Sequence, residues 1–255
     1  MHKLTSKFRG YVSLGSVKAV ITHPRLLLRL PGFVRELKTY RKLELQMTGN
    51  LTPLRFYPCL NDRQESQSGH GSYFYQDCWA ARQVFRERPE WGVDVGSTVL
   101  LVGILSQFTR WISVDIRPII SELEGLECKA GSVLSLPFKD NQVPCLTTMC
   151  VIEHIGLGRY GDPLNPAGTL DAALEIARVI KPGGIVVYSV PVGSDETLEF
   201  NANRRFRYSQ AAELFKGWEL VDSCLLTPSP KPLVSEHEIA EVKDPVACFC
   251  FRKPT

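Results

Sequence analysis

The chain has 255 residues, of which 44% are hydrophobic, and its formal net charge is +3 at pH 7. This length and composition allow one substantial hydrophobic core with an appended segment, and so small a charge does not by itself indicate a nucleic-acid partner. No apolar run approaches the roughly 20 residues that span a bilayer, and the N-terminus lacks the compact apolar segment of a signal peptide. We therefore expect a cytoplasmic protein without a transmembrane segment.

The N-terminal residues 1–70 are predicted to form a basic helical extension. Apolar side chains within residues 26–37 could form one stripe of a helix that Pro31 interrupts or restarts. We favour a cap that packs on the main domain over a helix that lies on a membrane surface, because the basic residues scatter around the helix. The polar stretch 61–71 is predicted to be a mobile loop.

From residue 71 to residue 255, helical and strand patterns alternate. The sequence predicts helices over residues 73–85, 100–108, 170–180 and 209–215. It predicts strands over residues 93–95, 112–115, 126–130, 145–152, 185–190, 218–225 and 247–251. This alternation indicates an α/β domain with a doubly wound parallel sheet.

The eight cysteines lie mostly within apolar runs and show no CxxC spacing. Buried, reduced thiols are therefore a better interpretation than a disulfide framework. Cys248 and Cys250 would share one face of a strand, where they act as small hydrophobic side chains. Neither the cysteines nor the five histidines form a ligand pair at a known zinc spacing, so we expect no metal site.

Two neighbouring strands end in residues suited to hold a nucleoside. The sequence VDVGS at residues 93–97 places a tight turn at Gly96, and Asp115 follows about 20 residues later at the end of the next strand. A carboxylate at that position can accept hydrogen bonds from both ribose hydroxyls. The alternative is that Asp115 only caps the turn before Pro118 and that Asp94 faces solvent.

Five motifs in this order resemble the class I S-adenosylmethionine-dependent methyltransferase family, over roughly residues 73–251. They are VDVGS at 93–97, VD at 114–115, GSVLSLPF at 131–138, VIEH at 151–154 and RVIKPGG at 178–184. The sequences YFYQD at 73–77 and GLGRYGD at 156–162 mark a branch of that family. The resemblance implies a Rossmann-like, mostly parallel, seven-stranded sheet whose last strand is antiparallel, with S-adenosylmethionine as cofactor.

The resemblance also implies which residues would surround the cofactor. Asp94, Gly96 and Ser97 would lie near its methionine part, and Asp115 would hold the ribose. Ser132 and Val133 would flank the adenine, and Val151 would line the floor. The full predicted set is Asp94, Gly96, Ser97, Thr98, Asp115, Ile116, Ser132, Val133 and Val151.

The chain departs from the family pattern in two ways. Thr98 and Leu100 stand where glycine is common in the loop after the first strand, and this narrows the approach of the backbone to a ligand. The absence of these glycines counts more against a dinucleotide, whose pyrophosphate needs close backbone contact, than against S-adenosylmethionine. Ser132 replaces a common acidic residue, which predicts adenine binding weaker by about 1 kcal/mol.

His154 is the candidate general base, with Glu153 beside it. His154 follows an apolar strand at the carboxyl edge of the sheet, where ligands bind in this architecture, and its imidazole could take a proton from an acceptor. The alternative is that His154 or Glu153 only hydrogen-bonds the following loop.

The candidate substrate residues come from three segments. Arg159, Tyr160 and Asp162 lie in a glycine-containing loop, where Arg159 could bind an anion or, slightly favoured, pair with Asp162. A second lid over residues 200–208 would present Arg205, although solvated loop charge is the default there. Tyr73 and Gln76 would share the face of a helix that covers the cofactor.

These observations favour an S-adenosylmethionine-dependent methyltransferase that acts on an oxygen or nitrogen of a small molecule or glycan, with an anionic acceptor as an open option. The alternative is a catalytically silent methyltransferase-like module that binds a protein partner through the basic N-terminal segment. A nicotinamide-dependent oxidoreductase ranks third because no GxGxxG turn is present. Nucleic acid is not an expected partner, since no motif for a flipped base is present, and the oligomeric state is open.

Overall fold

The computed structural model describes residues 28–54, 60, 71–226, 237–242 and 244–255. The chain forms two compact units, Met1–Gly69 and His70–Thr255. Most of the predicted loop over residues 61–71 lies outside the described residues. Cys59 lies outside them as well.

The first unit contains helix α2 (Leu30–Thr48). Pro31 lies in its first turn, where a missing N–H leaves no hydrogen bond unmade, so the proline starts the helix as the sequence allowed. The helix ends at Gly49 with a φ of 73°, whose N–H donates to Leu45 O at 3.0 Å. No residue of α2 is fully buried, and its role as a cap stays a prediction. Across the described chain, every helix is too short or too polar to span a bilayer.

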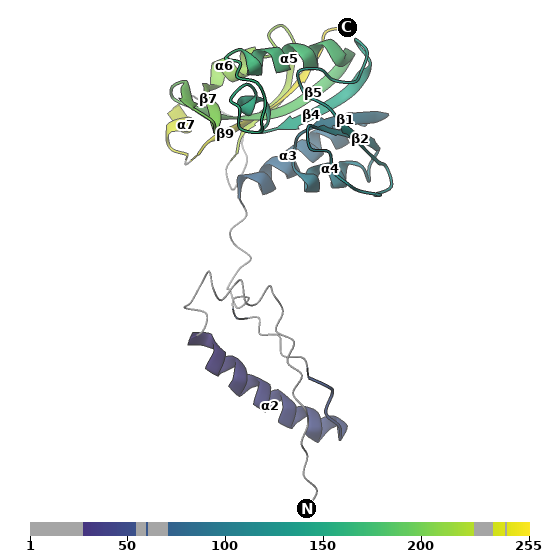
Figure 1. Ribbon diagram of the computed structural model, residues 1–255, viewed down its shortest axis with the longest axis vertical. Coiled ribbons are helices and arrows are strands. Elements are labelled where there is room, and N and C mark those ends of the chain that lie inside the picture. Colours follow the sequence, from purple (N-terminus) through teal and green to yellow (C-terminus); the bar gives the residue numbers. More distant parts are fainter. Residues whose placement is uncertain (1–27, 55–59, 61–70, 227–236, 243) are drawn as a thin grey trace, which may run out of the picture. The chain divides into compact units, whose positions relative to one another are not determined.

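The second unit is built around one twisted sheet with helices on both faces (Figure 1). Its strands are β1 (Trp91–Val95), β2 (Arg110–Asp115), β3 (Leu126–Ala130), β4 (Val143–Met149), β5 (Ile180–Gly193), β6 (Thr197–Glu199), β7 (Asn203–Arg207), β8 (Glu219–Leu225) and β9 (Val246–Arg252). Its helices are α3 (Ser72–Glu87), α4 (Val99–Leu105), the 3-10 helix η2 (Ile152–His154), α5 (Gly168–Val179), α6 (Tyr208–Glu213) and α7 (His237–Ala240).

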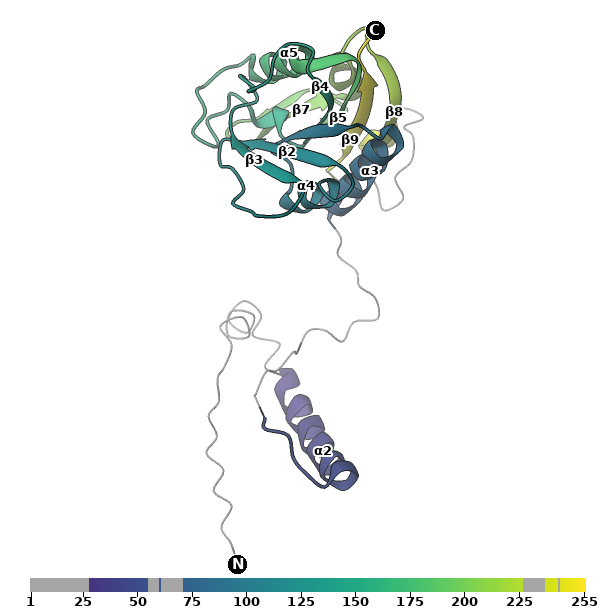
Figure 2. The ribbon, with the colours of Figure 1, turned by 90° about the vertical axis from the view of Figure 1, so that its right-hand side faces the viewer.

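The central strands run in the order β3-β2-β1-β4-β5-β9-β8. The first five are parallel to one another, whereas β9 is antiparallel to both β5 and β8. Figure 2 shows β3 and β8 at opposite ends of this sheet. The predicted doubly wound, mostly parallel sheet with an antiparallel last strand is therefore confirmed. The described chain gives it nine strands rather than the predicted seven, because β6 and β7 join it beside β5.

Two hydrophobic clusters cover the two faces of the sheet. The cluster on one face includes Trp79 of α3, Leu101 of α4 and the β9 cysteines Cys248 and Cys250. The cluster on the other face packs α5 and α6 against strands that are buried on both sides, such as β4, in which every residue is buried. Strands of this kind are expected in a sheet that is covered on both faces, and the cysteines act there as small apolar side chains.

The structure corrects the sequence at the end of β4. The predicted strand 145–152 ends at Met149, because Cys150 adopts a positive φ of 54° that breaks the extended backbone. The chain then forms η2, which presents Glu153 and His154 at the carboxyl edge of the sheet.

A hairpin replaces the loop that the sequence predicted over residues 200–208. Strands β6 and β7 pair antiparallel, and Phe206 of β7 pairs with Val192 in the extension of β5 beyond the sheet. Phe206 is 8% exposed and joins the core, so the hairpin is anchored by burial rather than solvated as a loop.

Candidate active site

The turn after β1 requires a glycine. Gly96 has a φ of 68°, and its N–H donates to Val114 O at 3.1 Å, which ties the turn to the end of β2. A Cβ atom at this position would lie 3.0 Å from Cγ1 of Val151 and 3.7 Å from Oδ2 of Asp115. Gly96 therefore leaves open the space between the ends of three strands.

Asp94 stabilises this turn through hydrogen bonds. Its carboxylate is fully buried and accepts hydrogen bonds from Ser97 N at 3.0 Å and Thr147 Oγ1 at 2.6 Å. Burial raises the pKa of Asp94 to about 6, although the Ser97 and Thr147 donors oppose this rise. Asp94 lines neither cavity described below, so it positions the turn, and the alternative in which it faces solvent is wrong.

The loop after β1 carries few glycines, and side-chain hydrogen bonds hold it in place. Ser97 Oγ accepts from Met149 N at 2.9 Å, which joins the loop to the end of β4. Thr98 caps α4 by accepting from Leu101 N, and its hydroxyl donates to Asp77 Oδ2 at 2.6 Å. Thr98 therefore fixes the conformation of this loop by hydrogen bonds, and it joins α3 to the loop.

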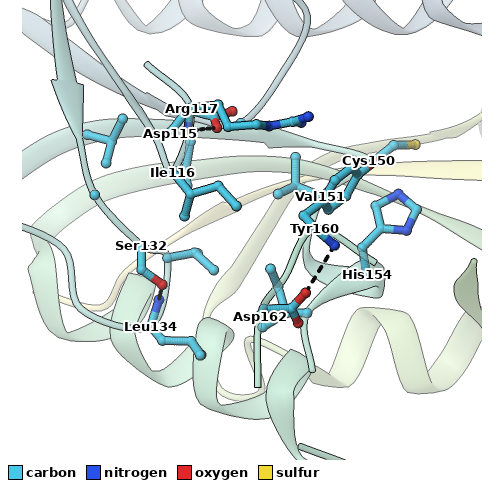
Figure 3. Close-up of a pocket in the computed structure, with 16 residues that line it drawn as sticks. Asp115, Ile116, Arg117, Ser132, Leu134, Cys150, Val151, His154, Tyr160 and Asp162 are labelled. Atoms are coloured by element: carbon cyan, nitrogen blue, oxygen red, sulfur yellow. Dashed lines mark hydrogen bonds between the residues drawn. The ribbon is translucent and has the colours of Figure 1, made fainter. Parts of the chain in front are cut away.

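Asp115 performs two tasks at once. Its Oδ1 accepts from Arg117 N at 2.7 Å, so the carboxylate caps the turn after β2, as the structural alternative proposed. Its Oδ2 lies beside Gly96, and both residues line a cavity of about 120 Å³ that is open to solvent. Figure 3 shows Asp115 and Ile116 on one side of this first cavity, with Val151, Tyr160 and His154 opposite.

The far end of the first cavity is mostly apolar. Val133 is buried, Ile116 is half exposed, and Leu134 completes the wall. Ser132 Oγ accepts from Leu134 N at 3.2 Å, and its hydroxyl hydrogen stays free to donate. The enclosed part is smaller than a typical pocket for a small molecule, so a nucleoside would lie partly in the open cleft.

A second cavity of about 360 Å³ adjoins the first. The two cavities share Gly96, Cys150, His154 and Tyr160. The other residues that line the second cavity are Ser72, Tyr73, Ser97, Thr98, Met149, Glu153, Arg159, Pro191, Asn203 and Val246. Tyr73, Glu153 and Arg159 thus lie in a different cavity from Asp115, Ser132 and Val133.

The His154 imidazole is held in one tautomer. Its Nδ1 lies 2.5 Å from Ala202 O, and because a carbonyl oxygen can only accept, Nδ1 carries the proton. Nε2 is then a proton acceptor. Burial lowers the pKa of His154 below its usual 6.5, and the Arg159 charge acts in the same direction against the Ala202 bond. The imidazole is therefore neutral at pH 7, as a general base requires.

Glu153 is a buried carboxyl group with an unused oxygen. The side chain is 1% exposed, and its Oε1 lies 3.5 Å from Nε2 of His154. Its Oε2 has no hydrogen-bond partner among the described residues. Burial raises the pKa of Glu153 to about 8, so this group is protonated and neutral at pH 7.

Gln76 differs from the prediction that it contacts substrate. It is 1% exposed and lines neither cavity. Its Oε1 accepts from Ser189 Oγ at 2.9 Å and from Cys150 Sγ at 3.1 Å. Gln76 therefore supports the strained Cys150 from behind the cavity wall.

The Asp162 carboxylate holds the loop over residues 156–162 through backbone N–H groups. Its two carboxylate oxygens accept from Gly156 N at 2.6 Å and from Tyr160 N at 3.3 Å. Burial opposes ionisation, but these backbone donors lower the pKa of Asp162 overall. The favoured Arg159–Asp162 pair is wrong, because the N–H groups of the backbone satisfy the carboxylate.

Arg159 instead lines the second cavity. Its Nη1 donates to Ala202 O at 3.2 Å, and its guanidinium lies 5.2 Å from the centre of the Tyr160 ring. Arg117 lies 4.7 Å from the same ring centre. Two cations therefore flank the tyrosine that both cavities share.

The hairpin arginines have structural roles. Arg204 donates to Ile155 O at 2.6 Å and to Asn165 O at 3.1 Å, which fixes the hairpin to the loop after η2. Arg205 lies 3.4 Å from Glu199 and 3.9 Å from Asp244, and it lines neither cavity. The structure therefore does not bring Arg205 to the site, because its side chain leaves the strand on the side of these carboxylates.

Sequence reasoning missed several lining residues. Arg117 follows Asp115 by two positions, and this spacing could have placed it at the same edge of the sheet. Asn203 reaches the second cavity only through the hairpin, for which the sequence held no clear signal. No group of three His, Cys, Asp or Glu side chains in the described parts of the chain could hold a metal ion.

Sequence comparisons identify no activity. Residues 138–239 match a family described as a Caenorhabditis protein of unknown function, DUF268, and this match covers less than half of the chain. A comparison with curated proteins gives no match.

Solved structures define the class of the fold. The 1,6-didemethyltoxoflavin-N1-methyltransferase of Burkholderia thailandensis, solved with 1,6-didemethyltoxoflavin and S-adenosylhomocysteine, matches with a TM-score of 0.53 and 15% identity, over 71% of this chain and 79% of that chain. The N-methyltransferase NodS of Bradyrhizobium japonicum WM9, in complex with S-adenosylhomocysteine, matches with a TM-score of 0.51 and 11% identity, over 76% and 94%.

The fold is therefore that of the class I S-adenosylmethionine-dependent methyltransferases, which confirms the resemblance at the level of the fold. The [4+2]-cyclase SpnF also matches, with a TM-score of 0.50 and 17% identity over 70% of this chain and 81% of that chain. Function must accordingly be argued from the site.

Proposed function

We propose that the protein is an S-adenosylmethionine-dependent methyltransferase that acts on a small molecule or glycan. One observation carries the proposal: an open cavity lies at the carboxyl edge of a methyltransferase-type sheet, between Gly96, Asp115 and Val151. Ligands bind at this edge in open α/β sheets. No bulky side chain of the described unit fills that space.

The residues present fit the cofactor. Oδ2 of Asp115 can accept from ribose hydroxyls because only Oδ1 is used by the turn. Ile116 and Val133 offer apolar surface to an adenine ring, and the Ser132 hydroxyl can still donate. Gly96 leaves room for the nucleoside beside Val151, whereas Ser97 and Thr98 extend the wall into the second cavity.

When bound, S-adenosylmethionine supplies an activated methyl group, so the protein needs to align an acceptor and exclude water. His154 provides a neutral imidazole with Nε2 available as proton acceptor. Glu153 and Tyr73 line the same cavity and can orient the acceptor. In this proposal the nucleoside binds in the first cavity and the acceptor in the second.

A silent binding module is the alternative, and one observation favours it. The loop after β1 is closed by its own side chains, since Ser97 bonds Met149 and Thr98 bonds Asp77. Such a loop offers fewer free groups to a methionine carboxylate. Silence of the protein toward every cofactor tested would favour this alternative.

Calorimetric titration of the full chain with S-adenosylhomocysteine tests the proposal. We expect micromolar affinity, about −8 kcal/mol, since such binding needs a formed pocket. Asp115→Ala should weaken it by about 10- to 100-fold, because the ribose loses bonds to a charged acceptor worth about 1.5–3 kcal/mol. Asp195→Ala, at an exposed aspartate outside both cavities, is the matched control.

Titration with NAD under the same conditions distinguishes cofactor classes. The proposed function is wrong if NAD binds and S-adenosylhomocysteine does not. It is also wrong if Asp115→Ala and Asp195→Ala bind S-adenosylhomocysteine equally well, because the nucleoside would then lie elsewhere.

A further inference from the structure

The second cavity is lined by side chains of two kinds. One kind is the proton acceptor Nε2 of His154, beside the buried carboxyl group of Glu153. The other is the Arg159 guanidinium, which lies beside the Tyr160 ring with Nη1 3.4 Å from Nδ1 of His154. We infer that the acceptor is a small hydroxy compound that carries an anionic group, a carboxylate or a phosphate, with its hydroxyl at Glu153 and His154 and its anion at Arg159. This inference rests on the proposed function.

The carboxyl group of Glu153 favours a polar ligand group. A buried oxygen without a hydrogen-bond partner is unfavourable by about 1–3 kcal/mol, and such groups are rare in folded chains. Glu153 is one of the residues that line the cavity, and its Oε2, which is itself buried, has no partner among the described residues. A ligand hydroxyl that reaches Oε2 satisfies it whichever oxygen carries the carboxyl proton, because a hydroxyl both donates and accepts.

His154 explains why the reactive group is a hydroxyl. Its Nε2 lies 3.5 Å from Glu153 Oε1, so one ligand oxygen can reach both side chains. The hydroxyl oxygen forms the new bond to the methyl carbon, and its proton passes to Nε2 of His154. The electron pair of the carbon–sulfur bond that breaks stays on the sulfur of the cofactor, which balances the transfer.

The Arg159 guanidinium explains the anion. Among the described residues, only Nη1 of Arg159 has polar neighbours, the Ala202 carbonyl at 3.2 Å and Nδ1 of His154 at 3.4 Å. Asp162, in the same loop, accepts from two backbone N–H groups and forms no ion pair with Arg159. The guanidinium therefore keeps its charge uncompensated and presents further donors to a carboxylate or phosphate.

The same charges disfavour an ammonium acceptor. Glu153 is the only acidic side chain that lines the second cavity in the described part of the chain, and at neutral pH it is protonated. Arg117 adds a second positive charge beside Tyr160. A cationic amine in the second cavity would meet the Arg159 guanidinium and no ionised carboxylate.

The test uses the full chain saturated with S-adenosylhomocysteine and a panel of small hydroxy acids, each paired with its neutral amide. One example is 4-hydroxybenzoate beside 4-hydroxybenzamide. A second arm pairs sugar phosphates with the free sugars, which separates phosphate from carboxylate. Binding is measured by calorimetry, and transfer is measured with a labelled methyl group on S-adenosylmethionine.

We expect at least one anionic compound to bind tenfold or more tightly than its neutral partner and to accept the methyl group. Arg159→Met should abolish this preference, whereas Arg82→Met, at an arginine of α3 that lines neither cavity, should keep it. Both variants should bind S-adenosylhomocysteine as the wild type does.

The outcomes separate the two proposals. If S-adenosylhomocysteine binds and no anionic compound exceeds its neutral partner, the anionic acceptor is wrong while the proposed function stands. A preference that survives Arg159→Met also overturns the inference. If S-adenosylhomocysteine does not bind, the proposed function itself fails.

Discussion

Replacement of Glu153 by Gln tests the electrostatics of the second cavity. Burial raises the pKa of Glu153 from 4.5 to about 8. Between these values the folded chain holds a proton that the unfolded chain releases, so the free energy of unfolding falls as the pH rises. Gln keeps the shape of the protonated carboxyl and does not ionise, so in the variant this fall in the free energy of unfolding is absent.

The expected size follows from the two pKa values. Relative to wild type, the variant should gain about 3 to 4 kcal/mol in free energy of unfolding between pH 5 and pH 8, from about 1.36 kcal/mol per pKa unit. Asp94 also has a raised pKa, about 6, but it is present in both proteins and cancels in the difference. The pH dependence of the difference therefore reports Glu153 alone.

Urea unfolding followed by circular dichroism at about pH 5, 6.5 and 8 and constant ionic strength measures this difference. Glu213→Gln, at a glutamate of α6 that lines neither cavity, is the control for loss of a carboxylate. A difference between Glu153→Gln and wild type that stays constant with pH would refute the reasoning. It would mean that Glu153 is ionised in the folded chain and that the cavity is more polar than its contacts indicate.

Two further substitutions address cofactor and acceptor. Gly96→Ala should weaken S-adenosylhomocysteine binding at least tenfold in calorimetry, because the residue has a φ of 68° and its Cβ would press on Val151 at 3.0 Å; Gly32→Ala, with open space around it, is the control, and equal affinities would contradict the role of the turn. His154→Gln should lower methyl transfer at least tenfold at pH 7. Because burial lowers the pKa of His154 below its usual 6.5, the acidic limb of the wild-type turnover profile should have its midpoint below pH 6.5, and a midpoint above pH 6.5 would exclude His154 as the base.

Much of the fold was predictable because its signals are local. Strands buried on both faces are short, apolar and rich in β-branched residues, and β1, β2 and the middle of β5 are of this kind. The turn at Gly96 was predictable for the same reason, since a positive φ next to a ligand space calls for glycine. The spacing from this turn to Asp115 placed both at one edge of the sheet.

The acceptor side of the site was less predictable because it depends on contacts between distant segments. The Arg159–Asp162 pair was plausible from composition, but the backbone N–H groups of Gly156 and Tyr160 take the Asp162 carboxylate once the loop is folded. Arg205 was assigned to a lid, although the hairpin directs it toward Glu199. A sequence does not show which hydrogen-bond or ion-pair partner a side chain takes when the fold brings several close to it.

The Tyr160 ring forms part of the boundary between the two cavities and is flanked by Arg117 and Arg159. A ligand in one cavity that displaces this ring changes the shape of the other cavity. Thermodynamic reciprocity then requires that each ligand alter the affinity for the other by the same factor. Cofactor and acceptor should accordingly bind with measurable cooperativity, whose sign reports whether the shared tyrosine is drawn inward or pushed aside.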